Sequence, residues 1–246
     1  MLYKIFPIDL GSMDIGSSSV FYRNRGGEIL RMTMGCFALQ DENDEWIMFD
    51  TGGPSNSESD AKGYPFERTD ENVEFLDAVK AAGVDPEGVK LLIISHLHWD
   101  HCWHNDCFPN AEIIVQADEI ITAIHPHKTS LKTYGWIPQE KVPKWVVSID
   151  RIHPVCGDIE VRPGLMYITT PGHSEGSASL IVDTAEGKYA LINDFAMNMR
   201  NITEQIPNGS CDTVSGWYRS YGKLMATGAR MLPTHDPIVY TRKIYG

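Results

Sequence analysis

Short runs of hydrophobic residues, separated by polar and turn-forming segments, recur along the whole chain. Runs of this length with turn residues on both sides are typical of β-strands. Residues 91–94 have no polar face, which is typical of a strand covered on both sides. In the first half of the chain the pattern predicts strands at residues 2–8, 34–40, 45–49, 91–94 and 113–115. In the second half it predicts strands near residues 165–169, 178–183 and 188–192.

A helix is predicted over residues 71–82 from the spacing of its apolar positions. Asp70 can cap the first turn, and Gly83 is expected to end the helix. The apolar face of this helix is expected to hold Val73, Leu76 and Val79.

Two further helices are predicted near residues 117–124 and 213–227. Because strands and helices interleave along the chain, the pattern indicates an α/β layered fold, and we expect residues 1–246 to form a single domain. Residues 52–66 are polar and turn-forming and are expected to form a surface loop. Residues 125–148 have no clear period, and we interpret them either as a cover over a site or as a plain surface loop.

The composition of the chain mainly argues against certain partners and cellular locations. The 21 basic and 33 acidic side chains give a net charge of −12, which disfavours nucleic acid and anionic membranes as partners. No run of about 18 apolar residues is present, so no membrane span is predicted, and the N-terminus lacks the pattern of a signal peptide. The 5 cysteines are typical of reduced thiols, so we expect a cytoplasmic protein. Cys102 and Cys107 flank His104 but have no CxxC partner, and we interpret them as ordinary thiols.

The densest group of chemically active residues directly follows the predicted strand at 91–94. His96 and His98 are two positions apart, so in an extended chain their side chains point the same way. If the chain turns into a helix after them, Asp100 and His101 can face a second, neighbouring point. Imidazole and carboxylate at this density suit zinc, or iron and manganese. The segment therefore predicts ligands for two metal ions.

Two metal ions need further ligands, and the sequence offers candidates in loops after predicted strands and helices. These candidates are His173, Asp194 and His235. Spacing alone leaves three other histidines open, for which surface or loop packing is the default role: His125, His127 and His153.

Residues 96–101 resemble the metallo-β-lactamase superfamily, whose His-x-His-x-Asp-His signature they match without gaps. Residues 49–52 look like the Asp-Thr-Gly turn of that family, and residues 170–176 look like the segment that bears its third histidine. The resemblance extends over roughly residues 30–240. It implies an αββα sandwich, in which two mixed β-sheets are flanked by helices and the metal site lies at one edge between the sheets.

The resemblance also implies a role for each candidate ligand. One metal ion would be held by His96, His98 and His173. The other would be held by Asp100, His101 and His235. Asp194 would bridge the two ions, and Asp50 would hold the ligand loop in place. We expect two divalent ions, zinc (Zn) first, with Mn or Fe as alternatives.

Residues 170–173 and 232–237 look most like the N-acyl homoserine lactone lactonases and related small-lactone hydrolases. An Asp at 194, rather than Cys or Ser, separates the chain from the β-lactam-cleaving members. The lactonases commonly carry a Tyr three residues after the bridging Asp, where this chain has Met197. A thioether cannot donate a hydrogen bond, so either another donor replaces that Tyr or the substrate differs. The open candidates for this donor are Asn193, Asn198 and the tyrosines of the irregular loops.

The implied reaction is the opening of a lactone ring, such as that of an N-acyl homoserine lactone, by a hydroxide that bridges two metal ions. Asp100 would pass a proton to the leaving oxygen. Apolar residues in predicted loops could line a tunnel for an acyl chain: Met13, Ile15, Phe21, Tyr22, Phe66 and Trp136. The alternatives are an ester or thioester hydrolase resembling glyoxalase II, a diiron oxidoreductase resembling the flavodiiron proteins, and a metal-binding member without turnover. A homodimer is compatible with the sequence, which leaves the oligomeric state open.

Overall fold

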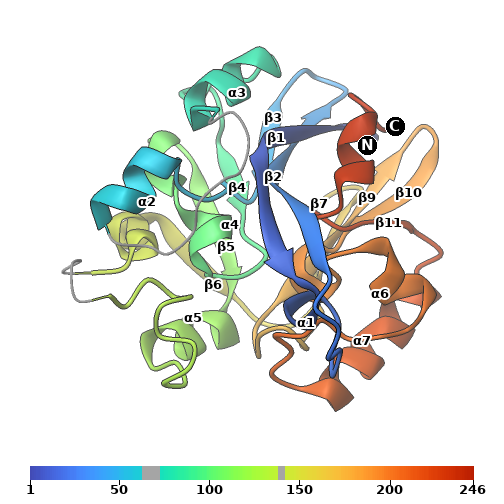
Figure 1. The fold of residues 1–246 in the computed structure, drawn as a ribbon. Coiled ribbons are helices and arrows are strands. Elements are labelled where there is room, and N and C mark those ends of the chain that lie inside the picture. Colours follow the sequence, from blue (N-terminus) through green and yellow to red (C-terminus); the bar gives the residue numbers. More distant parts are fainter. Residues whose placement is uncertain (63–72, 138–141) are drawn as a thin grey trace.

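Two β-sheets form the centre of the protein in a computed structural model that describes residues 1–62, 73–137 and 142–246 (Figure 1). The first sheet has the strand order β1 (Tyr3–Gly16), β2 (Ile29–Asp41), β3 (Trp46–Phe49), β4 (Leu91–Ile93), β5 (Glu112–Gln116) and β6 (Ile152–Val155). The second has the order β11 (Arg230–Leu232), β10 (Gly187–Leu191), β9 (Ala178–Thr184), β8 (Leu165–Thr169) and β7 (Ile159–Arg162).

Both sheets are mixed. In the first sheet, β1 to β3 pair antiparallel, whereas β3 to β6 pair parallel. In the second sheet the pairs from β7 to β10 are antiparallel, and β11 joins β10 in parallel. The expected pair of mixed sheets is therefore confirmed.

Helices cover the outer faces of both sheets (Figure 1). The first sheet carries α2 (Asn56–Lys62), α3 (Phe75–Ala81), α4 (Trp99–Cys102) and α5 (Ala117–Ile124). The second carries α6 (Met199–Thr203) and α7 (Val214–Ala226). The remaining short elements are α1 (Ser17–Val20) and the 3-10 helices η1 (Asn105–Cys107), η2 (Lys144–Arg151), η3 (Asn193–Phe195) and η4 (Pro237–Thr241). Among the described residues, no helix is long and apolar enough to cross a bilayer.

Alternation of side chains along the strands produces this layered arrangement. In β4, Leu92 packs under the helices of the first sheet, whereas Leu91 and Ile93 pack into the core between the sheets. In β9, Ile181 belongs to the core that includes Trp217 of α7. Each sheet therefore buries both faces, which explains why several strands lack a polar side.

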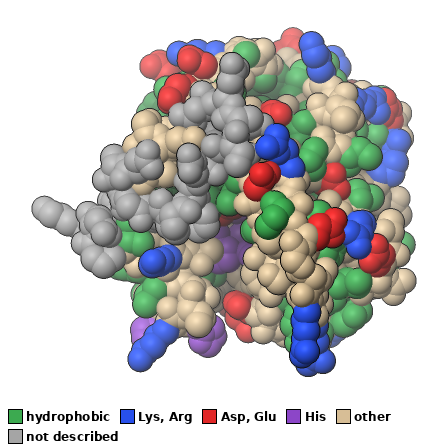
Figure 2. Space-filling view, in the orientation of Figure 1, with side chains coloured by type: hydrophobic (Ala, Val, Ile, Leu, Met, Phe, Trp, Pro, Cys, Tyr) green, Lys and Arg blue, Asp and Glu red, His purple; other side chains and the backbone are tan. Residues whose placement is uncertain are grey.

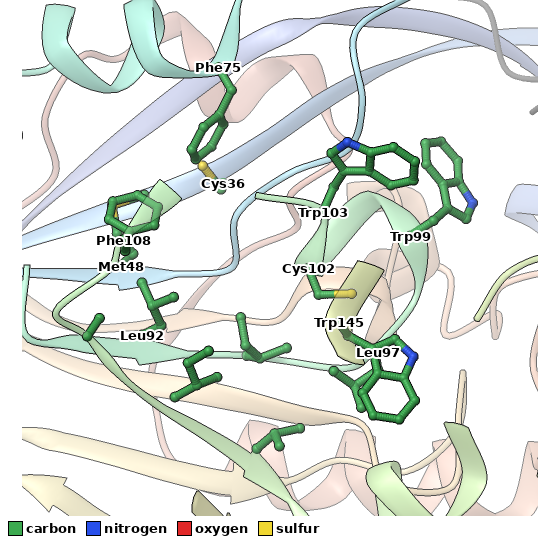
Figure 3. Close-up of a cluster of buried hydrophobic side chains, with 14 of the residues drawn as sticks. Cys36, Met48, Phe75, Leu92, Leu97, Trp99, Cys102, Trp103, Phe108 and Trp145 are labelled. Atoms are coloured by element: carbon green, nitrogen blue, oxygen red, sulfur yellow. The ribbon is translucent and has the colours of Figure 1, made fainter. Parts of the chain in front are cut away.

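The core under the first sheet's helices anchors the segment that carries the candidate ligands (Figure 3). Leu97, which lies between two of the ligand histidines, is fully buried in this core. Trp103 and Trp145 are buried in the same cluster. Packing of these side chains fixes the backbone from which the histidines project.

Most predicted elements are confirmed, with the helix at 117–124 and the strand at 165–169 matching α5 and β8 in their bounds. The prediction for the helix at 71–82 is partly wrong, because α3 begins at Phe75 and buries Phe75 and Val79. Val73 and Leu76 are exposed instead. The expected cap Asp70 lies outside the described residues.

The prediction of a surface loop at 52–66 is also wrong in its described part. Residues 52–55 are buried, and α2 begins at Asn56. The close approach explains the burial, because a Cβ on Gly53 would come within 3.0 Å of the Asp100 backbone. At Gly53 the chain therefore packs against the ligand segment rather than facing solvent.

Candidate metal centre

The candidate ligands of residues 96–101 fall on two sides because the chain changes conformation inside this segment. β4 ends at Ile93, the backbone of His98 is still extended (φ −69°, ψ 153°), and α4 begins at Trp99. The Trp99 N–H donates to the carbonyl oxygen of Thr133 (2.8 Å), which fixes the start of the helix. The predicted switch from extended chain to helix is therefore present.

Two groups of candidate ligands result, and within each group one ligand atom from every residue lies within 4.8 Å of the others. The first group consists of His96, His98 and His173. The second consists of Asp100, His101, Asp194 and His235. Residues far apart in the sequence meet here, since His98 Nδ1 lies 2.8 Å from His173 Nε2.

Asp194, in η3 shortly after β10, lies between the two groups. Its Oδ2 is 3.2 Å from Nε2 of His173 in the first group. Its Oδ1 is 2.9 Å from Nε2 of His235 and 3.2 Å from Nε2 of His101 in the second. One carboxylate therefore presents an oxygen to each group.

The imidazoles are held by the ring nitrogen that faces away from the cluster. His96 Nδ1–H donates to Ser95 Oγ (2.9 Å), and His235 Nδ1–H donates to the carbonyl oxygen of Thr33 (2.8 Å). His173 Nδ1 lies 3.3 Å from Ser210 Oγ, which can accept a hydrogen bond from it. In these tautomers each Nε2 keeps a lone pair directed at the cluster, which is the form that binds a metal ion.

Asp50 is the hub of the supporting hydrogen bonds. It accepts from the Ser95 N–H and Ser95 Oγ–H (each 2.7 Å) and from His101 Nδ1–H (2.7 Å). Asn193 Nδ2 also donates to Asp50, and Asn193 Oδ1 in turn accepts from the Thr234 hydroxyl. Asp50 has a φ of 61°, a left-handed conformation that non-glycine residues adopt only at a cost. The expected supporting position of Asp50 agrees with these contacts.

The donor set fits divalent metal ions. Three buried atoms, His96 Nε2, His101 Nε2 and Asp194 Oδ1, have no hydrogen-bond partner among the described residues. Burial lowers the pKa values of His96 and His98, which keeps both imidazoles neutral. Burial alone would raise the pKa of Asp194, but the nearby imidazoles, that of His235 above all, lower it. Burial alone would lower the pKa values of His101 and His235, but the carboxylates of Asp100 and Asp194 raise them. A bound divalent ion would take the place of the protons on these two rings, which is the proton-linked binding expected of a zinc-type site.

A cavity of about 480 Å³ opens onto the cluster. Apolar side chains line one part of it: Met13, Ile15, Met32, Met34 and Met197. Hydroxyl groups line another: Ser19, Thr129, Ser130, Thr133 and Ser210. Among the described residues no Lys or Arg lines the cavity, and the exposed Asp212 lies at its rim. Figure 2 shows histidine side chains near the centre of the visible face.

The structure brings all seven candidate ligands together, whereas the three alternative histidines lie elsewhere. His125, His127 and His153 are exposed and belong to neither group. Thr129, Ser130 and Thr133 line the cavity, so part of the irregular segment at 125–148 does cover the site.

The expected tunnel residues and the expected hydrogen-bond donor are only partly in place. Met13 and Ile15 line the cavity, whereas Trp136 packs against the core under the first sheet's helices. Phe21 is buried beside Met197, Tyr22 does not line the cavity, and Phe66 lies outside the described residues. The two asparagines are engaged elsewhere, because Asn193 binds Asp50 and Asn198 caps α6.

Several supporting residues gave no signal in the sequence. Thr33 contributes only a backbone carbonyl, which any residue could supply. Asn208 donates to the carbonyl oxygen of Asp194, and its place in a loop resembles that of many other asparagines. Glu119 is a fully buried acid in α5, and a helix pattern alone does not distinguish it from its exposed neighbour Asp118.

Comparison with known proteins shows what this fold and cluster are similar to. N-acyl homoserine lactonase AiiA of Bacillus thuringiensis subsp. kurstaki is 28% identical over 218 residues, covering 85% of this chain and 82% of that protein. N-acyl homoserine lactonase AttM of Azorhizobium caulinodans is 31% identical over 185 residues, covering 71% and 67%. A solved N-acyl homoserine lactone hydrolase with N-hexanoyl-L-homoserine at its catalytic metal center superimposes with a TM-score of 0.77, at 25% identity and coverage of 98% and 96%.

A family model agrees with these likenesses. Residues 36–219 match the model of the metallo-beta-lactamase superfamily, and this range contains six of the seven candidate ligands, all but His235. The dizinc lactonase AidC, at 16% identity and a TM-score of 0.71, shares the fold. The chain therefore belongs to the metallo-beta-lactamase superfamily, as a metal-dependent hydrolase similar to the N-acyl homoserine lactonases.

Proposed function

We propose that this protein opens the ring of neutral lactones, N-acyl homoserine lactones first among them, with two divalent metal ions held by the seven clustered residues. The position of Asp194 carries the proposal. Its two oxygens face different groups, 3.2 Å from His173 Nε2 and 2.9 Å from His235 Nε2, as a bridging ligand requires. The relatives named above support lactone hydrolysis as the activity.

Zinc is the metal that we propose, with manganese or iron as alternatives, because the donor set has five imidazoles, two carboxylates and no thiolate. Two such ions would supply hydroxide at neutral pH and polarise a carbonyl group. The residues behind His96, His101 and His235 keep these three rings in the tautomer that this role needs.

Asp100 is the residue that we assign to proton transfer. Its side chain is 14% exposed, whereas that of Asp194 is 4% exposed, and Asp100 lines the cavity. Its Oδ2 lies 3.7 Å from Nε2 of both His101 and His235. From there the carboxylate takes a proton from the attacking water and delivers it to the ring oxygen as the acyl C–O bond breaks. The products are an alcohol and a carboxylate on one molecule.

The lining of the cavity favours a neutral substrate with an apolar tail. The methionines that line the cavity can pack against an acyl chain, since thioethers adapt to irregular apolar shapes. A substrate anchored through its own carboxylate, as a β-lactam or a glutathione thioester would be, needs a cation that the described lining lacks. The acidic rim residue Asp212 repels such a group further. With Met at position 197, the hydroxyls of the lining are the donors within the cavity that can contact the substrate carbonyl.

The test is metal content and turnover on a panel of lactones, thioesters and β-lactams. We expect His98→Ala to lose zinc and lactone turnover, and Asp100→Asn to lose about 10²–10⁴-fold in kcat. His125→Ala removes an exposed histidine outside both groups and serves as the matched control. Full lactone turnover by His98→Ala would end the proposal. Faster turnover of thioesters than of lactones would favour the glyoxalase II-like alternative.

A further inference from the structure

Glu119 is a fully buried acid to which the proposed reaction gives no role. It lies in the first turn of α5, and its side chain is turned into the protein. Its two oxygens accept hydrogen bonds from two neutral donors, the Leu97 N–H at 2.9 Å and the Ser174 hydroxyl at 2.7 Å. A buried carboxylate is costly, so a purely apolar residue would serve packing better at this position.

The two donors belong to two different ligand segments. Leu97 lies between His96 and His98, in the segment that follows β4 of the first sheet. Ser174 directly follows His173, in the segment that follows β8 of the second sheet. A single carboxylate thus connects the two segments whose imidazoles approach to 2.8 Å.

The second ligand segment lies directly against the first turn of α5. A Cβ on Gly176 would come within 2.0 Å of the Glu119 backbone nitrogen and 2.4 Å of its Cα. Only glycine therefore lets this segment come close enough for Ser174 to reach the carboxylate. Tyr134 closes the same region, since its ring packs edge-on against His98 with centroids 4.5 Å apart.

We propose that Glu119 is a positioning residue that holds His98 and His173 at the spacing needed to bind one metal ion, the ion of the three-histidine group. The inference rests on the proposed metal pair. Glu119 acts through the backbone of Leu97 and the hydroxyl of Ser174, and it touches neither substrate nor metal. The group that contains Asp100 and His235 has supports of its own, the Thr33 carbonyl behind His235 and the Asp50 carboxylate behind His101.

The experiment is a competition titration of the whole protein with Zn²⁺ and a chromophoric chelator, which resolves two binding steps. His173→Ala identifies the step that belongs to the three-histidine group. We expect Glu119→Ala to weaken that step by about 10–100-fold and to leave the other unchanged. Glu119→Gln keeps an acceptor for Leu97 and a polar contact to Ser174, so it should restore most of the affinity. Asp118→Ala removes the exposed neighbouring acid in the same turn and should change neither step.

Ser174→Ala supplies a second variant in case Glu119→Ala does not fold, and it should weaken the same step by a smaller factor. Equal weakening of both steps, or wild-type affinity in Glu119→Ala and Ser174→Ala, would overturn the positioning role. Lactone turnover of the unmodified protein is measured in parallel. Absent turnover combined with a selective zinc defect would reject the proposed substrate and leave the role of Glu119 standing.

Discussion

Replacing Tyr167 with Phe tests whether the two sheets are locked together beneath the metal centre. Tyr167 lies in β8 of the second sheet and is fully buried. Its hydroxyl donates to the carbonyl oxygen of Ile94, directly after β4 of the first sheet, over 2.7 Å. Burial, with help from the charges of Asp50 and Glu119, raises the pKa of Tyr167 above its usual value. The phenol therefore stays protonated and keeps donating throughout the working pH range.

The loss of stability in Tyr167→Phe can be estimated because both partners of this hydrogen bond are buried. Removing the hydroxyl deletes one hydrogen bond and leaves a buried carbonyl short of a donor, which costs about 2 kcal/mol. For a chain of this size that lowers the Tm by roughly 4–8 °C. The assay is thermal unfolding of the metal-free protein followed by circular dichroism.

Tyr218→Phe is the matched control, since Tyr218 is 49% exposed and its hydroxyl bonds the Gln205 carbonyl at 3.2 Å on the surface. We expect its Tm to change by less than about 2 °C. Equal Tm values for the two variants would refute the reasoning that this buried bond ties the sheets together.

Three further changes give clear expectations. Gly222→Ala in the exposed part of α7 meets no atom within 4 Å and should raise the stability by about 0.5–1 kcal/mol in urea unfolding, whereas a loss would contradict the open site. Contact with the His104 imidazole, whose Nε2 lies 3.6 Å from Oε2 of Glu58, lowers the pKa of Glu58 to about 2. The stability that this contact contributes is therefore present above about pH 4.5 and lost as the pH falls toward 2. Glu58→Gln should flatten the fall in stability over that window, and an unchanged slope between pH 4.5 and 2 would disprove the linkage. Met197→Tyr should raise kcat/KM on acyl homoserine lactones by about tenfold, the gain expected from one added hydrogen bond to the substrate. Met197→Phe lacks the hydroxyl and should not raise it. Equal rates for the two Met197 variants would argue against a carbonyl contact there.

Local pattern predicts the elements whose environment is simple. The helix at 117–124 and the strand at 165–169 could be predicted from short local segments of the sequence, and their bounds match α5 and β8. The buried face of α3 could not be predicted, because a helix of seven residues offers few positions from which to identify a face. Phe75, rather than Leu76, is buried in the core. The prediction of a surface loop from residue 52 onward is wrong because residues 52–55 are buried, with Gly53 packed closely against α4.

Only part of the candidate site could likewise be predicted from local sequence. The short spacing of residues 96–101 predicts ligands for two metal ions without any knowledge of the fold. His173, Asp194 and His235 needed the family resemblance, because each is a lone residue far along the chain. The hydrogen bonds that hold these ligands in place could not be predicted, since the contact from His235 to Thr33, for example, spans 202 positions and uses a backbone oxygen. Such contacts follow from tertiary packing and leave no mark on residue type.

The most direct test of the metal pair is a crystal structure of the zinc-loaded protein, with anomalous data collected on both sides of the zinc absorption edge. The account predicts two anomalous peaks. One lies among His96 Nε2, His98 Nδ1 and His173 Nε2, and the other lies beside His101 and His235, with the Asp194 carboxylate between the two. A single peak, or a second peak outside these residues, would contradict it.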